Sequence, residues 1–464
     1  MKGDCFTNRE QKDMSNLHTH DNKRSSFSGK LGYVLSAAGA SVGLGNIWRF
    51  PYLAAKYGGG IFLLIYILLA LTFGYTMIMA ESALGRMTRK SPVGAFQAFR
   101  KAGWLSAGGW INAIIPVLIV PYYSVIGGWV IKYLIEYIRG NGKMLAADGY
   151  FSEFISDGVS TELCFILFCL FTLTIIYAGV RNGIERVSKF MMPILIVLSV
   201  LIAVYSVTRP GAMEGVKYFL VPNVKNFSWM TVVAAMGQMF YSLSIAMGIL
   251  ITFGSYMKKE TSLEDSTRNV EVFDTAIAIM AGLMIIPAVF SFSGGDPDTL
   301  QAGPALMFIT IPKVFENMGF GTVVGILFFL LVLFAAVTSS IALTESAVST
   351  FEDELGWSRR RATVLVGVIM IALGSLSSLG YGPLAGIKII GMQFLDFFDF
   401  LTNSVMMPIA AMLTSLFVSR IVGMKRMEEE IMHGESTFRR KKIFIVMIKY
   451  LCPVFALIIL ISSV

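Results

Sequence analysis

Charged residues, cysteine and histidine are all scarce in this sequence of 464 residues. Only 15% of the residues are charged, whereas soluble domains carry about 25%. The four cysteines, Cys5, Cys164, Cys169 and Cys452, show no CxxC spacing, which favours buried packing thiols over a disulfide framework. The HExxH, GxSxG and GxxxxGK[ST] patterns of zinc hydrolases, serine hydrolases and P-loop ATPases are missing. A soluble enzyme is therefore a poor interpretation of this chain.

Apolar residues take the place of the missing charges. The mean hydropathy is +0.69 and 55% of the residues are hydrophobic, which is enough for roughly ten or eleven membrane spans of about 20 residues each. The first 30 residues are polar and contain no apolar h-region, so we expect a tail and not a signal peptide. We predict eleven apolar segments, at 31–54, 60–85, 110–138, 162–180, 188–207, 229–257, 271–293, 322–351, 362–380, 391–419 and 443–463.

The basic residues are distributed unevenly between the two sides of these segments. Lys and Arg number 27 in the tail and the even-numbered connections, with Lys189 at the edge of the fifth segment included, but only 8 in the others. By the positive-inside bias, the N-terminus is predicted to be cytoplasmic, and an odd number of spans then places the C-terminus outside the cell. The net charge of +8 is explained by this placement in the cell membrane, so we predict a lipid bilayer and no nucleic acid as partner.

The first apolar segment contains residues that suit a continuous helix poorly. Gly39, Gly43 and Gly45 occur within seven residues, and Asn46 and Arg49 follow them. One interpretation is a small-residue face that packs against another helix. The other is a backbone opened within the membrane, which must line a cavity or bind a ligand because lipid cannot satisfy free N–H and C=O groups. The two polar side chains favour the second interpretation.

A similar interruption occurs in the sixth segment. Residues 238–248 place Ser242 and Ser244 within an otherwise apolar run. The first and sixth segments begin two consecutive units of five spans each. Interrupted segments at corresponding positions of two halves indicate the binding site of a secondary transporter.

Several motifs resemble those of one known family, the neurotransmitter:sodium symporters, and in particular its bacterial amino-acid transporters. The matching stretches are GASVGLGNIWRFPYLAAKYGGGIFLLIY, ESALGR, GIERVSKFMMP, GQMFYSLSIAMG, AAVTSSIAL and FEDELGWSRRR, and the resemblance covers residues 24–423. It implies an all-α membrane protein of eleven helices, built from two inverted repeats of five helices with helices 1 and 6 discontinuous. The implied organisation is a cytoplasmic tail (1–30), a first repeat (31–208), a second repeat (209–423) and a cytoplasmic loop with the last helix (424–464).

The resemblance implies two sodium sites built from carbonyl, hydroxyl and carboxylate oxygens, which hard cations prefer. The first site would use the substrate carboxylate together with Ser41, Asn46, Ser242 and Asp274. The second would use Gly39, Val42, Ala335, Thr338 and Ser339. For the hydroxyls of the second site the alternative is helix packing, with each hydroxyl bonded to its own helix backbone.

The resemblance also implies the substrate. Monoamine transporters of the family carry an aspartate where this chain has Gly43, so we expect the ligand to bring its own carboxylate and to be an L-amino acid. The implied pocket is apolar and favours a hydrophobic side chain, and Ala246, at a position usually occupied by glycine, is expected to narrow it. Its residues are Ser41, Gly43, Gly45, Ile119, Tyr123, Tyr241, Ser242, Ser244, Ala246, Met247, Ser339 and Leu343.

One departure from the family concerns chloride. Many members carry Asn where this chain has Asp274, and chloride-dependent members carry Ser where this chain has Ala278. A fixed carboxylate beside a cation supplies the charge that a mobile anion would otherwise provide. We therefore predict sodium coupling without chloride, with Asp274 as a candidate site of proton exchange.

Two gates and a release path are also implied. Arg49 and Asp399 match the extracellular gate, and Gly183 with Pro193 matches a segment that unwinds to release sodium. The cytoplasmic gate is matched by Arg24, Phe27, Tyr256 and Asp353, although Arg24 is also explained as an ordinary basic tail residue. Glu345 has no counterpart, and the sequence leaves open whether it bonds within the helix bundle or handles protons.

The predicted function is sodium-coupled symport of an L-amino acid by alternating access, in which spans 1, 2, 6 and 7 move against the rest. The alternative is a membrane sensor of the same fold that binds the amino acid without productive transport. A membrane enzyme is a third hypothesis, and no nucleophile and base pair supports it.

Overall fold

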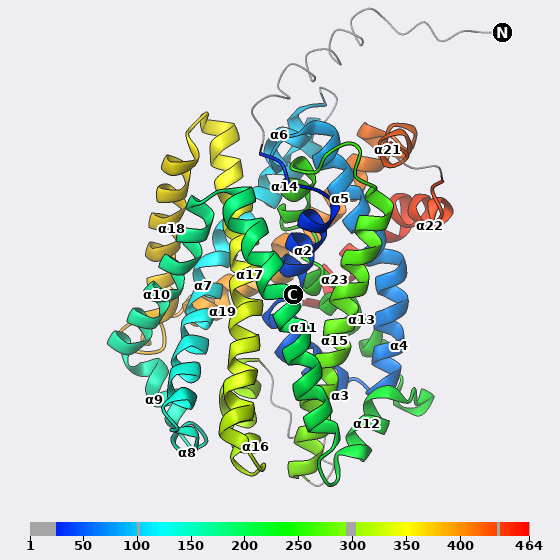
Figure 1. The fold of residues 1–464 in the computed structure, drawn as a ribbon. Coiled ribbons are helices and arrows are strands. Elements are labelled where there is room, and N and C mark those ends of the chain that lie inside the picture. Colours follow the sequence, from blue (N-terminus) through cyan, green and yellow to red (C-terminus); the bar gives the residue numbers. More distant parts are fainter. Residues whose placement is uncertain (1–24, 100–102, 294–302, 434–436, 464) are drawn as a thin grey trace, which may run out of the picture.

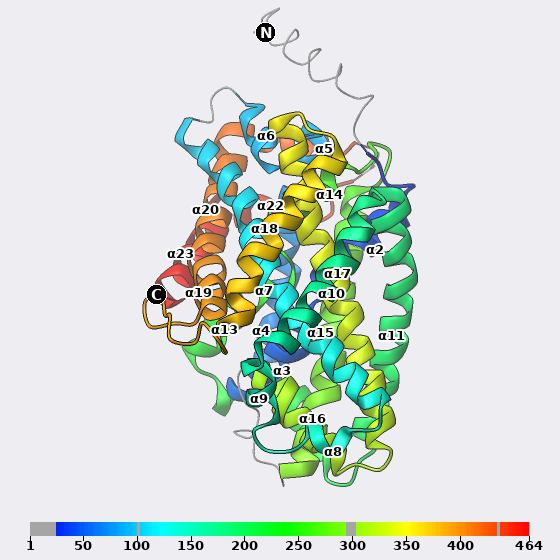
Figure 2. The ribbon, with the colours of Figure 1, turned by 90° about the vertical axis from the view of Figure 1, so that its left-hand side faces the viewer.

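The chain folds into a bundle of helices that run mostly along one direction (Figures 1 and 2). The computed structural model describes residues 25–99, 103–293, 303–433 and 437–463. Every regular element within these residues is a helix, and the only β pairing among them is two isolated bridges. The prediction of an all-α protein is therefore confirmed.

Short π and 3-10 turns, labelled η, join many of the α-helices. The first part of the chain forms α2 (Lys30–Ser41), η1 (Gly45–Arg49), α3 (Phe50–Lys56), α4 (Gly60–Leu69), η2 (Ala70–Gly74), α5 (Tyr75–Thr88), α6 (Pro92–Gln97), η3 (Gly103–Ser106), α7 (Ala107–Ile138), α8 (Gly142–Leu145), α9 (Tyr150–Ser156) and α10 (Gly158–Tyr177). The middle part forms η4 (Val180–Glu185), α11 (Arg186–Val207), α12 (Ala212–Leu220), η5 (Val224–Asn226), α13 (Trp229–Ser242), α14 (Ile249–Ser255) and α15 (Leu263–Ser293). The last part forms η7 (Leu306–Thr310), α16 (Ile311–Glu316), α17 (Gly321–Leu355), α18 (Arg359–Leu379), α19 (Phe394–Asp399), η8 (Phe400–Met406), α20 (Met407–Phe417), η9 (Val418–Val422), α21 (Met424–Ile431), α22 (Lys441–Val446), η10 (Met447–Leu451) and α23 (Cys452–Ser463).

Nine helical runs within the described residues are long and apolar enough to cross a membrane. They coincide with nine of the eleven predicted segments. Some begin earlier than predicted: α15 starts at Leu263 and not near residue 271. Glu264 and Asp265 occupy its first turn, where acidic side chains stabilise a helix although they lower the hydropathy.

The remaining two predicted segments are interrupted. In the first, α2 ends at Ser41, Val42 adopts an extended conformation (φ −76°, ψ 92°), and helical structure resumes in η1. Glycine is needed in this break because side chains of other helices approach its backbone closely. A Cβ on Gly43 would lie 2.7 Å from Ser339 Oγ, and one on Gly45 would lie 2.4 Å from the ring of Tyr241.

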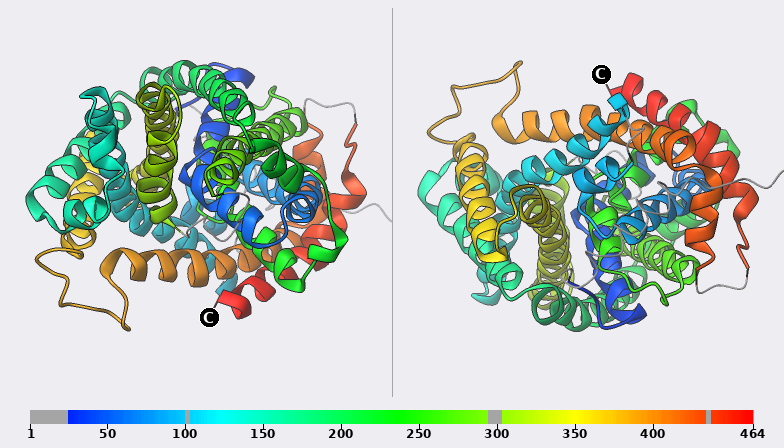
Figure 3. Two further views of the ribbon diagram at one scale, coloured as in Figure 1. Left: turned by 90° about the horizontal axis from the view of Figure 1, so that it is seen from below. Right: turned by 90° about the horizontal axis from the view of Figure 1, so that it is seen from above.

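The second interruption separates α13 from α14. Between them, Ser244 (φ 53°), Ala246 (φ 59°) and Gly248 (φ 69°) adopt the left-handed conformation. That conformation disfavours serine and alanine, so the surrounding structure must hold this turn in place. Figure 3 shows α2, in dark blue, beside α17, and α14 packs against α17 as well.

Candidate substrate and ion site

A cavity lies where the two interrupted helices face α7 and α17. Its free volume is about 30 Å³, which is room for one or two water molecules, so the lining side chains nearly close the site in this structure. Most of the predicted substrate residues line it, and Ala40, Leu44 and Ile249 are lining residues that the sequence did not indicate. The lining consists of Ala40, Ser41, Gly43, Leu44, Gly45, Asn46, Ile119, Tyr123, Tyr241, Ser244, Met247, Ile249, Ser339 and Leu343.

Two predicted substrate residues do not line this cavity. Ser242 faces Asp274, to which its hydroxyl donates at 2.9 Å. Ala246 is fully buried, and its backbone N–H donates to Glu81 Oε1 at 2.8 Å. Ala246 is therefore not among the residues that line the cavity in this structure.

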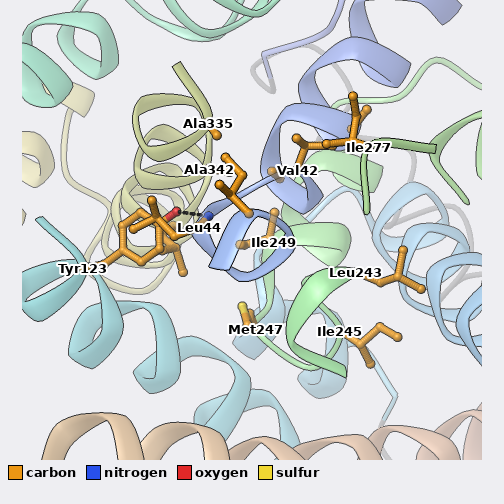
Figure 4. Packing of buried hydrophobic residues seen from close by; sticks show 14 of the residues in the cluster. Val42, Leu44, Tyr123, Leu243, Ile245, Met247, Ile249, Ile277, Ala335 and Ala342 are labelled. Carbon is orange, nitrogen blue, oxygen red and sulfur yellow. Dashed lines mark hydrogen bonds between the residues drawn. The ribbon is translucent and has the colours of Figure 1, made fainter. Parts of the chain in front are cut away.

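The polar groups of the cavity come from opened backbone and from side-chain hydroxyls. Leu44 N–H donates to the hydroxyl of Tyr123 at 3.3 Å, a contact drawn in Figure 4. The Ser244 hydroxyl donates to the Ala40 carbonyl at 3.0 Å, which ties the two interrupted helices together. Apolar side chains, among them Met247 and Ile249, surround this polar edge (Figure 4). The arrangement suits a ligand with one charged end and one apolar end.

The residues predicted for the second sodium site converge at the end of α2. Ser339 Oγ lies 3.3 Å from the Gly39 carbonyl oxygen, 3.1 Å from that of Ala40 and 3.4 Å from that of Val42. Thr338 instead donates to Phe334 O at 2.9 Å and to Ala335 O at 3.2 Å, within its own helix. Carbonyl and hydroxyl oxygens gathered this closely fit a hard monovalent cation.

The residues predicted for the first sodium site form a buried hydrogen-bonded group. Asn46 Nδ2 donates to Asp274 Oδ1 at 2.8 Å and to Ser242 Oγ at 2.9 Å. Tyr66, which the sequence did not indicate, donates to Asp274 Oδ2 at 3.0 Å. The Ser41 hydroxyl bonds to Ala37 O within α2, so the Ser41 carbonyl remains the group suited to an ion.

The groups at these two sites are not those that bind transition metals. Within the described residues, no three His, Cys, Asp or Glu side chains cluster as metal ligands. The oxygens come from carbonyls, hydroxyls, one amide and one carboxylate, the ligand set that suits sodium.

On one side of the cavity lie the residues predicted for the extracellular gate. The Arg49 guanidinium lies 5.3 Å above the centre of the Tyr241 ring. Asp399 accepts from Asn403 Nδ2 at 2.5 Å and from the Tyr122 hydroxyl at 3.3 Å. Arg49 and Asp399 are both described, and no salt bridge joins them, so the structure places the pair in one region without direct contact.

On the opposite side lie the residues predicted for the cytoplasmic gate, of which Arg24 lies outside the described residues. Phe27 is buried, its backbone N–H donates to Tyr256 O at 3.1 Å, and its ring packs edge-on to the Tyr256 ring at 6.0 Å. Asp353 accepts from Ser91 N–H at 2.6 Å. Phe27 thus fixes the start of α2 against the end of α14.

Glu345 belongs to this cytoplasmic group. The Arg359 guanidinium binds both of its carboxylate oxygens, at 3.0 Å and 2.5 Å, and the Tyr256 hydroxyl donates to it at 2.6 Å. Arg359 also donates to Ile176 O at 2.9 Å. Glu345 therefore bonds within the bundle, and a part in proton handling stays a hypothesis.

The predicted release path runs along the start of the fifth span. Gly183 lies in the π turn η4, and a Cβ there would lie 2.1 Å from Ile175 O. Pro193 lies inside α11, which is helical from Arg186 to Val207. The segment is folded in this structure, so its unwinding stays a prediction.

Two further residues that the sequence did not indicate support the interrupted helices. Glu81, in α5, is fully buried and accepts from Ala246 N–H in the left-handed turn. Gln238, in α13, donates to the Gly45 carbonyl at 3.0 Å. A carboxylate within an apolar span marks a functional position, and Glu81 is the first residue of the ESALGR motif, so a signal for it was present.

Discontinuous helices around a cavity with free backbone oxygens are typical of the binding sites of secondary transporters. Comparisons with known proteins support the same class. The profile of the Sodium:neurotransmitter symporter family matches residues 24–145 and 151–464. The chain therefore belongs to this family, and it is a sodium-dependent membrane transporter and not an enzyme.

Several relatives show how far the likeness extends. A sodium-dependent transporter of Bacillus subtilis, YhdH, is 35% identical over 415 residues, which cover 88% of this chain and 91% of YhdH. The human sodium- and chloride-dependent GABA transporter 2 is 28% identical, over 88% of this chain and 75% of its own length. The solved structure of MhsT in complex with L-phenylalanine matches with a TM-score of 0.85 and 35% identity, covering 95% of this chain and all of MhsT.

Proposed function

We propose that the protein is a symporter of hydrophobic L-amino acids that couples their uptake to two sodium ions and needs no chloride. The observation that carries this proposal is the cavity between the interrupted helices, which has backbone polar groups at one edge and apolar side chains elsewhere. The likeness to MhsT, which was solved with L-phenylalanine, supports an amino acid of this type. A monoamine is disfavoured, because Gly43 presents no carboxylate and a side chain there would meet Ser339.

The substrate carboxylate is proposed to join the first sodium ion beside Asn46 and Asp274, which couples the binding of one to the other. The second ion is proposed to bind among the carbonyls of Gly39 and Val42 and the hydroxyl of Ser339. In this scheme sodium binding holds the opened ends of α2 against α17. Loss of the ion frees α2 to move, which opens the cytoplasmic side.

The proposed topology follows from the nine uninterrupted and two interrupted spans. Together they make eleven, arranged as inverted repeats at 31–208 and 209–423, with the N-terminus in the cytoplasm and the C-terminus outside the cell. The placement of basic residues supports this orientation.

Uptake into proteoliposomes tests the function. We expect labelled L-phenylalanine or L-leucine to accumulate inside when an inward sodium gradient is applied, and to do so equally in chloride and gluconate buffers. Dissipation of the gradient with a sodium ionophore is expected to abolish accumulation. Saturable binding without accumulation would support the alternative, an amino-acid sensor.

Glu81 offers a second test, because it holds the turn between α13 and α14. Hydrogen bonds to charged groups contribute about 1.5–3 kcal/mol, so Glu81→Ala is expected to weaken sodium-dependent amino-acid binding by roughly 10- to 100-fold. Glu81→Gln keeps an acceptor of the same shape and is expected to retain most of the affinity. Scintillation proximity binding on the purified protein measures both.

The matched control is Glu136→Gln, which makes the same change at a buried carboxylate of α7 that pairs with Lys132 at 2.8 Å. It is expected to leave amino-acid affinity unchanged. Parental affinity in Glu81→Ala would show that the turn does not depend on this carboxylate.

A further inference from the structure

The last membrane-crossing run, formed by α22, η10 and α23, is the least enclosed of the nine found within the described residues. Only 33% of its most apolar window is buried inside the protein. Figure 3 shows this run, in red, at the rim of the bundle. Val446 and Tyr450 are 48% and 65% exposed. This surface therefore faces lipid.

Basic residues are concentrated at the start of this run, and protein carboxylates neutralise two of them. Arg440 donates to Glu271 at 3.0 Å, and its guanidinium lies 4.5 Å from the centre of the Tyr75 ring. Lys441 forms an ion pair with Glu428 in α21. These two pairs fix the helix start against α15 and α21.

Two other lysines of the run have no such partner. Lys442 and Lys449 are exposed, and neither forms a hydrogen bond or ion pair with any described residue. They are seven residues apart, and the π turn η10 begins between them, so they lie on roughly the same side of the helix. Lys449 is about 10 Å along the axis from Lys442.

The charge of Lys449 would be stabilised by an anion. Its neighbours on the exposed surface are Val446 and Tyr450, and an unpaired ammonium among apolar groups at a lipid-facing surface is unfavourable. A lysine in that position extends its amine toward the headgroup level of the membrane. Lys442, seven residues nearer the start of the run, reaches the same level.

We propose that Lys442 and Lys449 bind the phosphate of an anionic phospholipid between them. The apolar surface of Val446 and Tyr450 contacts the acyl chains, which selects a lipid over a soluble phosphate. Two amines without a carboxylate partner favour a headgroup of net negative charge over a zwitterionic one. The site is separate from the transport cavity and does not depend on the identity of the substrate.

Native mass spectrometry of the purified full-length protein, titrated with phosphatidylglycerol or phosphatidylcholine, tests this proposal. The parent is expected to prefer phosphatidylglycerol. A lysine near the membrane surface contributes enough to change affinity about fivefold, so Lys442→Gln and Lys449→Gln are each expected to weaken phosphatidylglycerol binding about fivefold, and the double variant about 25-fold. Phosphatidylcholine binding is expected to stay unchanged, and glycerol phosphate is expected not to compete.

The matched control is Lys143→Gln with Lys225→Gln, two exposed lysines of α8 and η5, which removes the same charge elsewhere. It is expected to retain the parental preference. Equal phosphatidylglycerol binding by the parent and the two single variants would overturn the proposal, as would competition by glycerol phosphate. The single variants change one exposed side chain each, so they decide the matter even if the double variant loses its fold.

Discussion

Replacing Asp274 with serine is expected to make transport depend on chloride. Asp274 is fully buried and joins Asn46, Ser242 and Tyr66, so it supplies negative charge at the proposed first sodium site. At an effective dielectric constant of about 20, a unit charge about 4 Å from a cation contributes about 4 kcal/mol. We therefore expect sodium affinity in chloride-free buffer to fall about 100-fold or more. The serine leaves space and a donor for chloride, which is expected to restore most of the affinity.

The comparison variant is Asp274→Asn, which removes the charge but keeps the volume. It is expected to lose sodium affinity to a similar extent and to gain less from chloride, because no space is opened for the anion. The measurement is amino-acid uptake as a function of sodium concentration, in chloride and in gluconate. If both variants transport at the parental rate without chloride, Asp274 does not take the place of the anion.

Removing Arg359 is expected to produce the largest loss of stability and to open the cytoplasmic side. Arg359 neutralises Glu345, which is fully buried and also holds Tyr256. Breaking a buried ion pair by removing one partner costs about 3–5 kcal/mol, because an uncompensated charge is left behind. Arg359→Met is therefore expected to lower the melting temperature in detergent by several degrees. It is also expected to increase cysteine labelling along the cytoplasmic path.

The double variant Arg359→Met with Glu345→Met separates the loss of stability from the opening of the cytoplasmic side. Replacing both charges by apolar groups of similar volume is often neutral for stability, so the melting temperature is expected to recover while the cytoplasmic side stays more accessible. The neighbouring change Arg360→Met, which removes a guanidinium 5.5 Å from the centre of the Tyr177 ring, is the control and is expected to change neither property. A double variant as unstable as Arg359→Met would show that the loss does not come from the unpaired carboxylate.

The sequence predicted the spans well because lipid imposes a length and a composition on each of them. It also indicated both interruptions, since Gly43, Gly45 and Asn46 in one segment and Ser242 and Ser244 in the other suit a membrane helix poorly. The identification of the residues proposed to bind ions and substrate depended on the resemblance to the family. Nothing in local spacing relates Asn46 to Asp274, which the fold brings into contact across 228 positions of sequence.

The missed features are long-range pairs and backbone shape. Glu81 stabilises a turn 165 positions away, and Arg359 neutralises Glu345 across a helix boundary. Neither partner can be recognised until the bundle is assembled. Ala246 was expected to face the substrate, but it does not line the cavity in this structure, and the left-handed turn directs its N–H toward Glu81.

The account is tested most directly by coupled uptake. Purified protein in proteoliposomes, given an inward sodium gradient and labelled L-phenylalanine or L-leucine in chloride-free buffer, is expected to accumulate the amino acid above its external concentration. The Asn46→Ala variant, which lacks the amide between Ser242 and Asp274, is expected to fail under the same conditions. Accumulation that continues without sodium, or saturable binding that never leads to accumulation, would contradict sodium-coupled symport.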